Sequence, residues 1–545
     1  MRKFGSASLL LVLLALGHGT SSSAQGTPNS GGALIGRTQI RTLSLGPDMI
    51  PRSGTYTPSG KVLVSYQTPG NSDPRQVSLA IVDDDGRNAR TIFSQRVPDR
   101  PKDNGIRFMV FSDNRRVFLG DFILECAPSL DACAKSTLLP VQYPSEVADG
   151  DHIGHRWSEM IIAPDNRHVA WTTLLSNYAA VVLTGELWRE GGGYVIAKPR
   201  IISTLNPFKP DPEHPDGIIP QTVRGGEVKQ FVDGGSAISM AGAARRDLPD
   251  SVVQHLASGQ VEPITDTPGY TETTIFSPDE RLGLTMTTRF STADPAILGL
   301  LPKPYPTSLN MGLNMFAYTY AVTGVRAGRQ GSIGPALIEI DASKTQDNYV
   351  GVNLNTQKEW VFHSPMSWRP DGKKGLWIEG LRGGDARRIQ IVELPDYRPG
   401  PTIKTKPTPD VISYASSDLS IIPDLVKTSR DIDAKVYGRA SGYIQYRRTA
   451  TSIDKTYVDF SDDGKGIYSG HETMRSNPRG ASVYTAQVKL TGPKSGAMDL
   501  QITYGPLGGD HPASLVFAPD ATGKPATRGY AEYDGQRLMA DSLEP

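Results

Sequence analysis

The sequence has little of several features that mark common protein classes. It contains only two cysteines and nine histidines in 545 residues. Acidic and basic side chains number 57 each, so the formal net charge is zero, which argues against a nucleic-acid binder that relies on phosphate attraction. No apolar run approaches the roughly 20 residues that a membrane-spanning helix needs. With 38% hydrophobic and 21% charged residues, the composition fits a globular protein with a packed core.

Several catalytic signatures are missing as well. The sequence has no Gly-x-Ser-x-Gly elbow, no His-Glu-x-x-His, no Walker A loop, no Gly-x-Gly-x-x-Gly and no Cys-x-x-Cys. These absences exclude a complete prolyl-oligopeptidase and argue against the commonest zinc peptidases, NTPases, dinucleotide-binding proteins and redox proteins. If the protein is an enzyme, its site is assembled from distant parts of the chain.

The N-terminus has the three parts of a secretory signal peptide. Arg2 and Lys3 precede the apolar run Leu9 to Leu16, and Ala24 ends a stretch of small residues suited to cleavage. The alternative is an N-terminal core helix. We therefore expect residues 1–24 to be a signal peptide and the mature protein to be periplasmic or secreted.

The two cysteines lie close together in the sequence. Cys126 and Cys133 flank a Pro-Ser-Leu-Asp turn, and in an oxidising compartment two such cysteines form a local disulfide. A metal site is the weaker alternative, because two thiols supply only half of the four ligands that a structural zinc site needs.

Glycine and proline are plentiful, at 56 and 42 residues, and many of them belong to a recurring element. In this element an apolar strand leads into a turn of Pro or Ser, Asp or Asn, and Gly, and a second apolar strand follows. Proline presets φ, Asp bonds back to the backbone and Gly accepts positive φ, so each copy predicts a β-hairpin. The copies begin at Thr57, Ser112, Ala163, Val232, Ser277, Arg369, Ser461 and Ala518.

The spacing of the copies predicts an all-β protein. The shorter gaps match a four-stranded antiparallel propeller blade of roughly 40–50 residues, and the longer gaps require loop insertions. We expect a β-propeller of seven or eight blades.

Three of the copies carry a family resemblance. The strings TIFSPDERLGLTMTT, WRPDGKKGLWIEG and VDFSDDGKGIYSG resemble the PD40 (WD40-like) repeat of TolB-type β-propellers. The resemblance extends from about residue 45 to the C-terminus. It implies residues 25–44 as a flexible mature N-terminus and 45–545 as one propeller domain. Related repeats occur in periplasmic assembly proteins, in peptidase propellers and in oligogalacturonate lyases, so the resemblance implies a fold more than an activity.

Three insertions interrupt the expected repeats. The proline-rich residues 189–226 predict a long loop over one propeller face, and residues 398–435 predict another proline-rich connection with a short helix. Residues 291–335 are rich in Leu, Met and aromatic side chains. This segment either packs over the channel mouth or offers an apolar binding surface.

Three histidines occupy comparable places ahead of repeat turns. His155, His363 and His511 precede their turns by six to eight residues, where segments of different blades approach the propeller axis. Converging imidazoles are suited to a divalent metal such as Mn²⁺ or Zn²⁺, as in the oligogalacturonate lyases that these repeats resemble. The alternative is that they are ordinary polar residues at loop–strand junctions.

Further polar residues lie near the same places in their repeats. They are candidates for ligand binding at the channel mouth: Arg107, Glu159, Glu272 and Lys455. Two functions follow from the sequence. One is a binding or scaffolding module for a protein or small ligand, without nucleic acid. The other is a metal-dependent lyase or hydrolase acting on an oligosaccharide-type substrate, not a serine peptidase.

Overall fold

The computed structural model places strands over most of the chain. It describes residues 34–544 apart from 99–108, 159, 178, 243–247, 292–294, 305–308, 310–320, 322–332, 347–348, 356, 428–430, 478–479 and 507–513. No helix among the described residues is long and apolar enough to cross a membrane.

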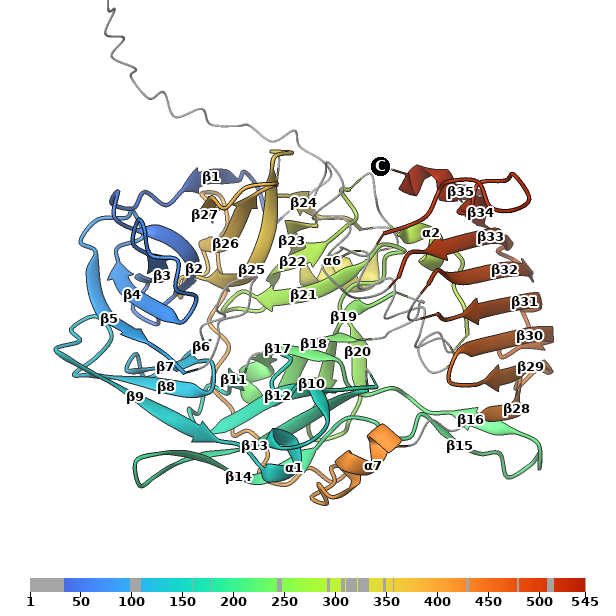
Figure 1. The fold of residues 1–545 in the computed structure, drawn as a ribbon, viewed down its shortest axis with the longest axis horizontal. Coiled ribbons are helices and arrows are strands. Elements are labelled where there is room, and N and C mark those ends of the chain that lie inside the picture. The colour runs from blue at the N-terminus through green and yellow to red at the C-terminus, as the bar shows by residue number, and fades with distance from the viewer. Residues whose placement is uncertain are drawn as a thin grey trace, which may run out of the picture.

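Six four-stranded antiparallel units follow one another around a ring (Figure 1), and the protein is an all-β protein with a β-propeller. The first strand of each unit, here called a blade, lies nearest the centre. Blade 1 consists of β2 (Ile50–Tyr56), β3 (Val62–Gln67), β4 (Gln76–Val82) and β5 (Arg90–Arg96); blade 2 of β6 (Met109–Val110), β7 (Arg116–Leu119), β8 (Phe122–Ala127) and β9 (Lys135–Gln142); blade 3 of β11 (Ile161–Ile162), β12 (His168–Leu175), β13 (Ala180–Glu190) and β14 (Gly193–Ile201), with β10 (His152–Gly154) also paired to β12.

The remaining blades complete the ring. Blade 4 consists of β17 (Glu227–Val232), β18 (Ala237–Gly242), β19 (Asp250–His255) and β20 (Val261–Pro263); blade 5 of β21 (Thr271–Phe276), β22 (Leu282–Thr287), β23 (Gly334–Glu339) and β24 (Val352–Asn353); blade 6 of β25 (Trp360–Trp368), β26 (Lys374–Leu381), β27 (Arg387–Glu393) and β1 (Gln39–Thr42). Strand β1 therefore closes the ring by pairing with β27. The sequence predicts a flexible segment over residues 25–44, but Gln39–Thr42 form a paired strand, so for these four residues the prediction is wrong.

The first hairpin of every blade is the repeat found in the sequence. In five of the six turns, the backbone N–H of one residue donates to the carbonyl three residues before it, as Gly372 does to Arg369. Each of the six turns also contains a residue with positive φ, which Gly and Asn tolerate best. In four turns the aspartate carboxylate also accepts a backbone N–H two residues on, as expected. The residues with positive φ are Gly60 (+83°), Asn114 (+55°), Asn166 (+59°), Gly234 (+67°), Glu280 (+55°) and Gly372 (+69°).

The described residues form six blades rather than the expected seven or eight, because the last two copies of the repeat lie elsewhere. The chain after the propeller forms one antiparallel sheet of eight consecutive strands (Figure 1). The copy at Ser461 is a turn inside this sheet, and the copy at Ala518 follows its sixth strand. The strands are β28 (Ile432–Tyr437), β29 (Ser441–Arg448), β30 (Ser452–Ser461), β31 (Ile467–Arg475), β32 (Ser482–Thr491), β33 (Gly496–Tyr504), β34 (Arg528–Tyr533) and β35 (Gln536–Met539).

The eight-stranded sheet shares a hydrophobic core with blades 5 and 6. Its inner-face side chains Tyr446, Tyr484 and Leu500 are buried in the same cluster as Leu298 and Trp377. The helix α2 (Ala296–Gly299) thus places part of the apolar 291–335 segment in the core, and the rest of that segment lies mostly outside the described residues. Short helical elements elsewhere are α1 (Ser145–Ala148), α6 (Ile340–Thr345), α7 (Ile421–Lys427), η1 (Asp233–Gly235) and η3 (Ala540–Leu543).

The 189–226 insertion has more order than a loop. Residues 193–201 complete blade 3 as β14, and the hairpin β15 (Phe208–Pro210) and β16 (Ile218–Pro220) extends toward the eight-stranded sheet. Gly217 forms a parallel bridge with Lys435 of β28. The insertion therefore connects the propeller to the edge of the other sheet.

A strap of residues 395–416 runs along the repeat turns of successive blades. The backbone N–H of Gly400 donates to Asp279 in blade 5 at 2.8 Å, and that of Lys406 donates to the Gly234 carbonyl in blade 4 at 2.9 Å. Asp410 then reaches blade 3. Beyond the strap, α7 packs against α1. Within the 398–435 segment, residues Ile421–Lys427 form the short helix α7.

Candidate functional site

A wide cavity lies where blades 2 and 3 meet. Its volume is about 890 Å³, in the range of small-molecule sites. The outer strands β9 and β14 pair in parallel there, with Tyr194 opposite Val141 and Val195 opposite Gln142. Helix α1 and the segment before β11 supply another wall, and the β7–β8 turn supplies Asp121. We call this cavity the β9–β14 pocket.

His155, one of the three histidines singled out in the sequence, lies on the wall of this pocket. Its Nε2 is 3.0 Å and 3.1 Å from the two carboxylate oxygens of Asp121, and Arg156 Nε donates to Asp121 at 2.8 Å. Thr173 in β12 donates to the His155 carbonyl and helps to hold the loop in place. The ring of Tyr143 meets His155 edge-on, with centroids 5.1 Å apart.

Asp121 is a charged group at neutral pH. Burial raises its pKa, but the hydrogen bond from His155 and the charge of Arg156 outweigh burial and lower the pKa to about 2. A carboxylate that holds an imidazole fixes the orientation of the ring. The pair is thus suited to orient a polar ligand through a hydrogen bond.

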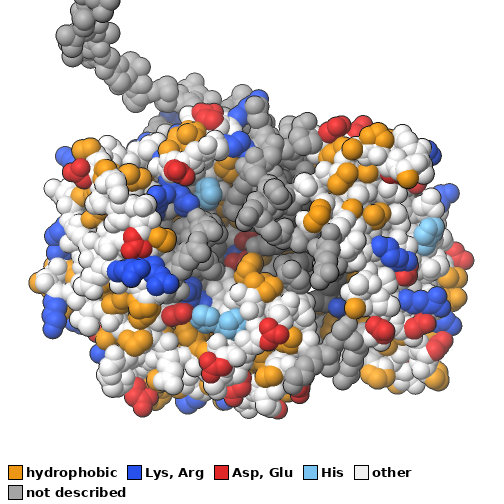
Figure 2. Space-filling view, in the orientation of Figure 1, with side chains coloured by type: hydrophobic (Ala, Val, Ile, Leu, Met, Phe, Trp, Pro, Cys, Tyr) orange, Lys and Arg blue, Asp and Glu red, His pale blue; other side chains and the backbone are white. Residues whose placement is uncertain are grey.

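The rest of the pocket combines an apolar floor with an acidic rim. The rim carboxylates are Glu146, Asp149 and Glu190, and none of them has an ion-pair partner among the described residues. In Figure 2, acidic side chains gather around histidines at the lower centre of the face, in the region of α1 and β10. The floor consists of Val141, Tyr143, Val195, Ile196 and Pro199.

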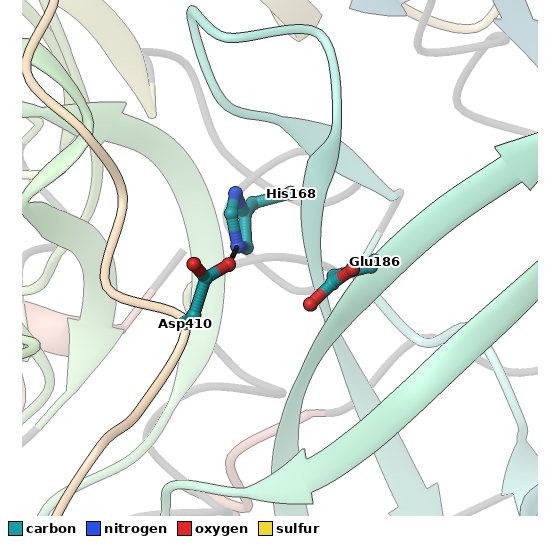
Figure 3. A group of neighbouring side chains, drawn as sticks. All are labelled: His168, Glu186 and Asp410. Carbon is teal, nitrogen blue, oxygen red and sulfur yellow. Dashed lines mark hydrogen bonds and ion pairs between the residues drawn. The ribbon is translucent and has the colours of Figure 1, made fainter.

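A second cluster lies beneath the strap. His168 in β12, Glu186 in β13 and Asp410 in the strap bring one ligand atom each to within 4.8 Å of one another (Figure 3). Within the described part of the chain, this is the one group of three or more such residues with that spacing. The adjoining cavity has a volume of about 20 Å³, enough for a single water molecule.

This cluster does not fit a metal ion, because basic side chains already occupy its carboxylates. Lys198 Nζ lies 2.9 Å and Arg167 lies 2.7 Å from the buried Glu186 carboxylate. Arg167 also pairs with Asp410 at 3.1 Å. These charges outweigh burial and lower the pKa of Glu186 to about 2. A divalent ion would have to displace two cations, so the cluster is better described as the ionic attachment of the strap to blade 3.

The predicted histidine trio stays a prediction. His363 lies in β25 opposite Ile378, beside Gly380. Neither His155 nor His363 belongs to a group of three close ligand atoms among the described residues. His511 lies outside the described residues, so the metal-dependent lyase or hydrolase is untested.

Two of the four predicted ligand-binding residues, Arg107 and Glu159, also lie outside the described residues. Glu272 lies in β21 near the propeller centre and is buried. Its carboxylate accepts hydrogen bonds from Lys229 Nζ and the Tyr270 hydroxyl, both at 2.8 Å. These contacts give Glu272 a packed, charge-paired environment.

Lys455, the fourth predicted ligand-binding residue, lies in β30 of the eight-stranded sheet. It pairs with Glu472 at 2.5 Å, and Lys303 Nζ reaches the same carboxylate at 3.3 Å. All three side chains are at most 2% exposed. The structure therefore does not bring Lys455 together with His155 in one site.

Sequence reasoning missed most of the β9–β14 pocket. Asp121 lies 34 residues before His155 in an ordinary hairpin turn, and no local pattern sets it apart. Glu146, Asp149 and Glu190 are dispersed acids at element ends. The one available signal was the concentration of Glu146, Asp149 and Asp151 just ahead of His155.

Comparisons with known proteins address the fold alone. No protein-family model and no curated protein matches the sequence. Among solved structures, a TolB candidate from Agrobacterium tumefaciens is 11% identical over 57% of this chain and 83% of its own, with a TM-score of 0.33. TolB from Acinetobacter baumannii is 11% identical over 62% of each chain, with a TM-score of 0.29. A Trypanosoma rangeli sialidase in complex with sialic acid is 11% identical over 92% and 88%, with a TM-score of 0.29. At these scores the likeness says nothing about activity, and the protein is similar to these structures in its propeller-like fold.

Proposed function

We propose that this protein is an exported ligand-binding β-propeller of the TolB-like PD40 type, and that its ligand binds in the β9–β14 pocket. The observation that carries the proposal is the pocket itself, with a volume of about 890 Å³ and a charged Asp121–His155 pair on its wall. Binding sites combine such a concave apolar surface with a few oriented polar groups.

Export is supported by two features of the chain. The N-terminal pattern of Arg2, Lys3 and the apolar run predicts a signal peptide, and Cys126 and Cys133 form a disulfide, which is typical of oxidising compartments. N-terminal sequencing of the protein from its native host should therefore begin at Gln25. A mature protein that retains Arg2 and Lys3 would contradict export by this signal.

The binding role is tested by filling the pocket. Ala148 is exposed on α1 and lines the cavity, so Ala148→Trp adds bulk without disturbing the core. We would measure thermal unfolding of the full chain and of this variant against a library of cationic, neutral and anionic small molecules. A ligand at 100 times its Kd should stabilise the native protein by about 2.7 kcal/mol.

The expected result is that at least one ligand class raises the Tm of the native chain and leaves Ala148→Trp unchanged. Glu213→Gln, an exposed change in the β15–β16 hairpin, is the control and should respond as the native chain does. The proposal is wrong if no class distinguishes the native chain from Ala148→Trp.

A further inference from the structure

The charges around the β9–β14 pocket are unbalanced. Asp121, Glu146, Asp149 and Glu190 all line it, and no Lys or Arg is among its described lining residues. Arg156, whose side chain is 9% exposed, is hydrogen-bonded to Asp121. The other described acids near β14 are neutralised, as Glu186 is by Lys198. The surface that the described residues give the pocket is therefore negative, and a concave wall of low dielectric constant focuses such a field.

The carboxylates are spread out rather than converging. A metal site would bring several carboxylate or imidazole atoms to one point, and no group of three such atoms within 4.8 Å occurs among the described residues of this pocket. A spread of single negative charges matches instead a ligand with separated cationic groups. Ammonium and guanidinium groups interact with individual carboxylates through hydrogen bonds and charge.

The floor of the pocket calls for an apolar portion in the same ligand. Val195 and Pro199 of β14 are half-buried, and Val141 of β9 is buried beside them. Apolar surface that a ligand removes from water contributes roughly 25 cal/mol per Å². A simple inorganic cation would leave this floor unused.

We infer that the β9–β14 pocket binds a ligand that carries amine or guanidinium groups on an apolar skeleton, with Glu146, Asp149 and Glu190 as its charge-recognising residues. This inference rests on the proposed binding function and adds the chemical class of the ligand. A free polyamine-like compound and a basic segment of a peptide share this chemistry.

The test uses the peptide amide Lys-Leu-Lys and spermidine as probes with the full chain. The matched control peptide replaces each lysine by norleucine, which keeps the methylenes and removes the ammonium. Isothermal titration should show Lys-Leu-Lys binding at least about tenfold tighter than the norleucine peptide. Each exposed charge pair contributes modestly to the free energy of binding, and the contributions of several pairs add up. Binding should weaken as salt rises, because the rim is exposed to solvent. Tighter binding of spermidine would indicate a free amine, and tighter binding of the peptide would indicate a peptide segment.

The variants localise the effect. Glu190→Gln should weaken Lys-Leu-Lys binding about two- to fivefold, and the combined change Glu146→Gln, Asp149→Asn, Glu190→Gln should weaken it roughly 10–30-fold. Glu213→Gln should leave it unchanged. If the norleucine peptide binds as tightly as Lys-Leu-Lys or more tightly, and Ala148→Trp abolishes that binding, the inference about the ligand class is overturned while the binding function stands. Binding of neither probe, in a chain that responds to another ligand class in the thermal assay, would also overturn it. A chain that responds to no class overturns the function itself.

Discussion

Nε2 of His168 lies 3.1 Å from Oδ1 of Asp410, although 242 residues separate them in the sequence. His168 begins β12, and its Nδ1 lies 2.6 Å from Asp165 in the repeat turn of the same blade. The imidazole therefore lies between two carboxylates, one from blade 3 and one from the strap. This contact attaches the strap to blade 3, after its contacts with blades 5 and 4.

Asp410→Asn should loosen the strap. The variant keeps the shape of the side chain and removes a charge shared by His168 and Arg167. Because Asp410 is largely exposed, we expect a loss of about 1 kcal/mol in the free energy of unfolding. Urea unfolding at pH 6 would measure it, with Asp431→Asn, an exposed change beyond the strap, as the control. A loss equal to that of the control would contradict the attachment.

The strap contact should depend on pH. Burial lowers the pKa of His168, but the hydrogen bond and charge of Asp165 outweigh burial, so the pKa lies above its usual value of about 6.5. The groups facing this ring are Asp165, Asp410, Arg167, Glu186 and Lys198. A raised histidine pKa gives stability that is fully present below pH 6.5 and is lost as pH rises through the folded value. The stability difference between the native chain and His168→Gln should shrink as pH rises from 6 to 9. A difference that grows with pH would contradict this account.

Asp121→Asn tests the charged pair in the pocket. The pKa of Asp121 is lowered to about 2, so its contribution to stability is present above pH 4 and is lost as pH falls toward 2. The native chain should be more stable than Asp121→Asn by about 1–2 kcal/mol at pH 7, and the two should converge at pH 2 to 3. Chemical unfolding across this pH range gives the measurement. Equal stability at pH 7 would show that Asp121 does not hold His155 and Arg156.

Glu472→Gln should strongly destabilise the eight-stranded sheet. The buried carboxylate neutralises Lys455 and Lys303, whose charges outweigh burial and lower the pKa of Glu472 to about 2. Removing it leaves two buried ammonium groups unpaired by this carboxylate, which costs about 3–5 kcal/mol. Asp499→Asn, an exposed change in the same sheet, is the control and should be nearly neutral. A loss below 1 kcal/mol for Glu472→Gln would contradict the buried charge pairing.

The double change Cys126→Ser, Cys133→Ser should lower the free energy of unfolding by about 2–3 kcal/mol. The disulfide closes a loop with a sequence separation of 7, and a loop of this size restricts the unfolded chain by roughly that amount. Unfolding of the native chain with and without reductant gives the comparison. A reductant that also destabilises the serine variant would show an effect unrelated to the disulfide.

Much of the propeller could be predicted from local sequence. The repeat turns at Thr57 and Arg369 can be predicted from their own residues, because proline and glycine, with serine or aspartate between them, favour the backbone of a hairpin turn. The blade count could not be predicted in the same way. The turn at Ser461 has the same local chemistry, but its strands belong to one continuous sheet. The residues of a turn determine the hairpin that they close and do not determine which further strands pair with it.

The ring closure and most of the site depend on contacts between distant residues. The strand Gln39–Thr42 is short and polar, and it is recognised as a strand only through its pairing with β27. His155 was identified from its place ahead of a repeat turn, whereas Asp121 joins it only after two blades have folded side by side. Sequence reasoning finds residues whose position follows from a repeat and misses partners that the packing of blades brings near.

Hydrogen exchange with bound probe tests the central claim most directly. With Lys-Leu-Lys amide at saturation, amide exchange should slow in residues 119–122 and 141–156, which contain Asp121, Glu146, Asp149 and His155 of the β9–β14 pocket. It should stay unchanged in the outer strands of blade 6 and in residues 432–475. Ala148→Trp should remove the protection. Protection confined to the eight-stranded sheet or to the propeller centre, with none at 141–156, would contradict the assignment of this pocket as the binding site.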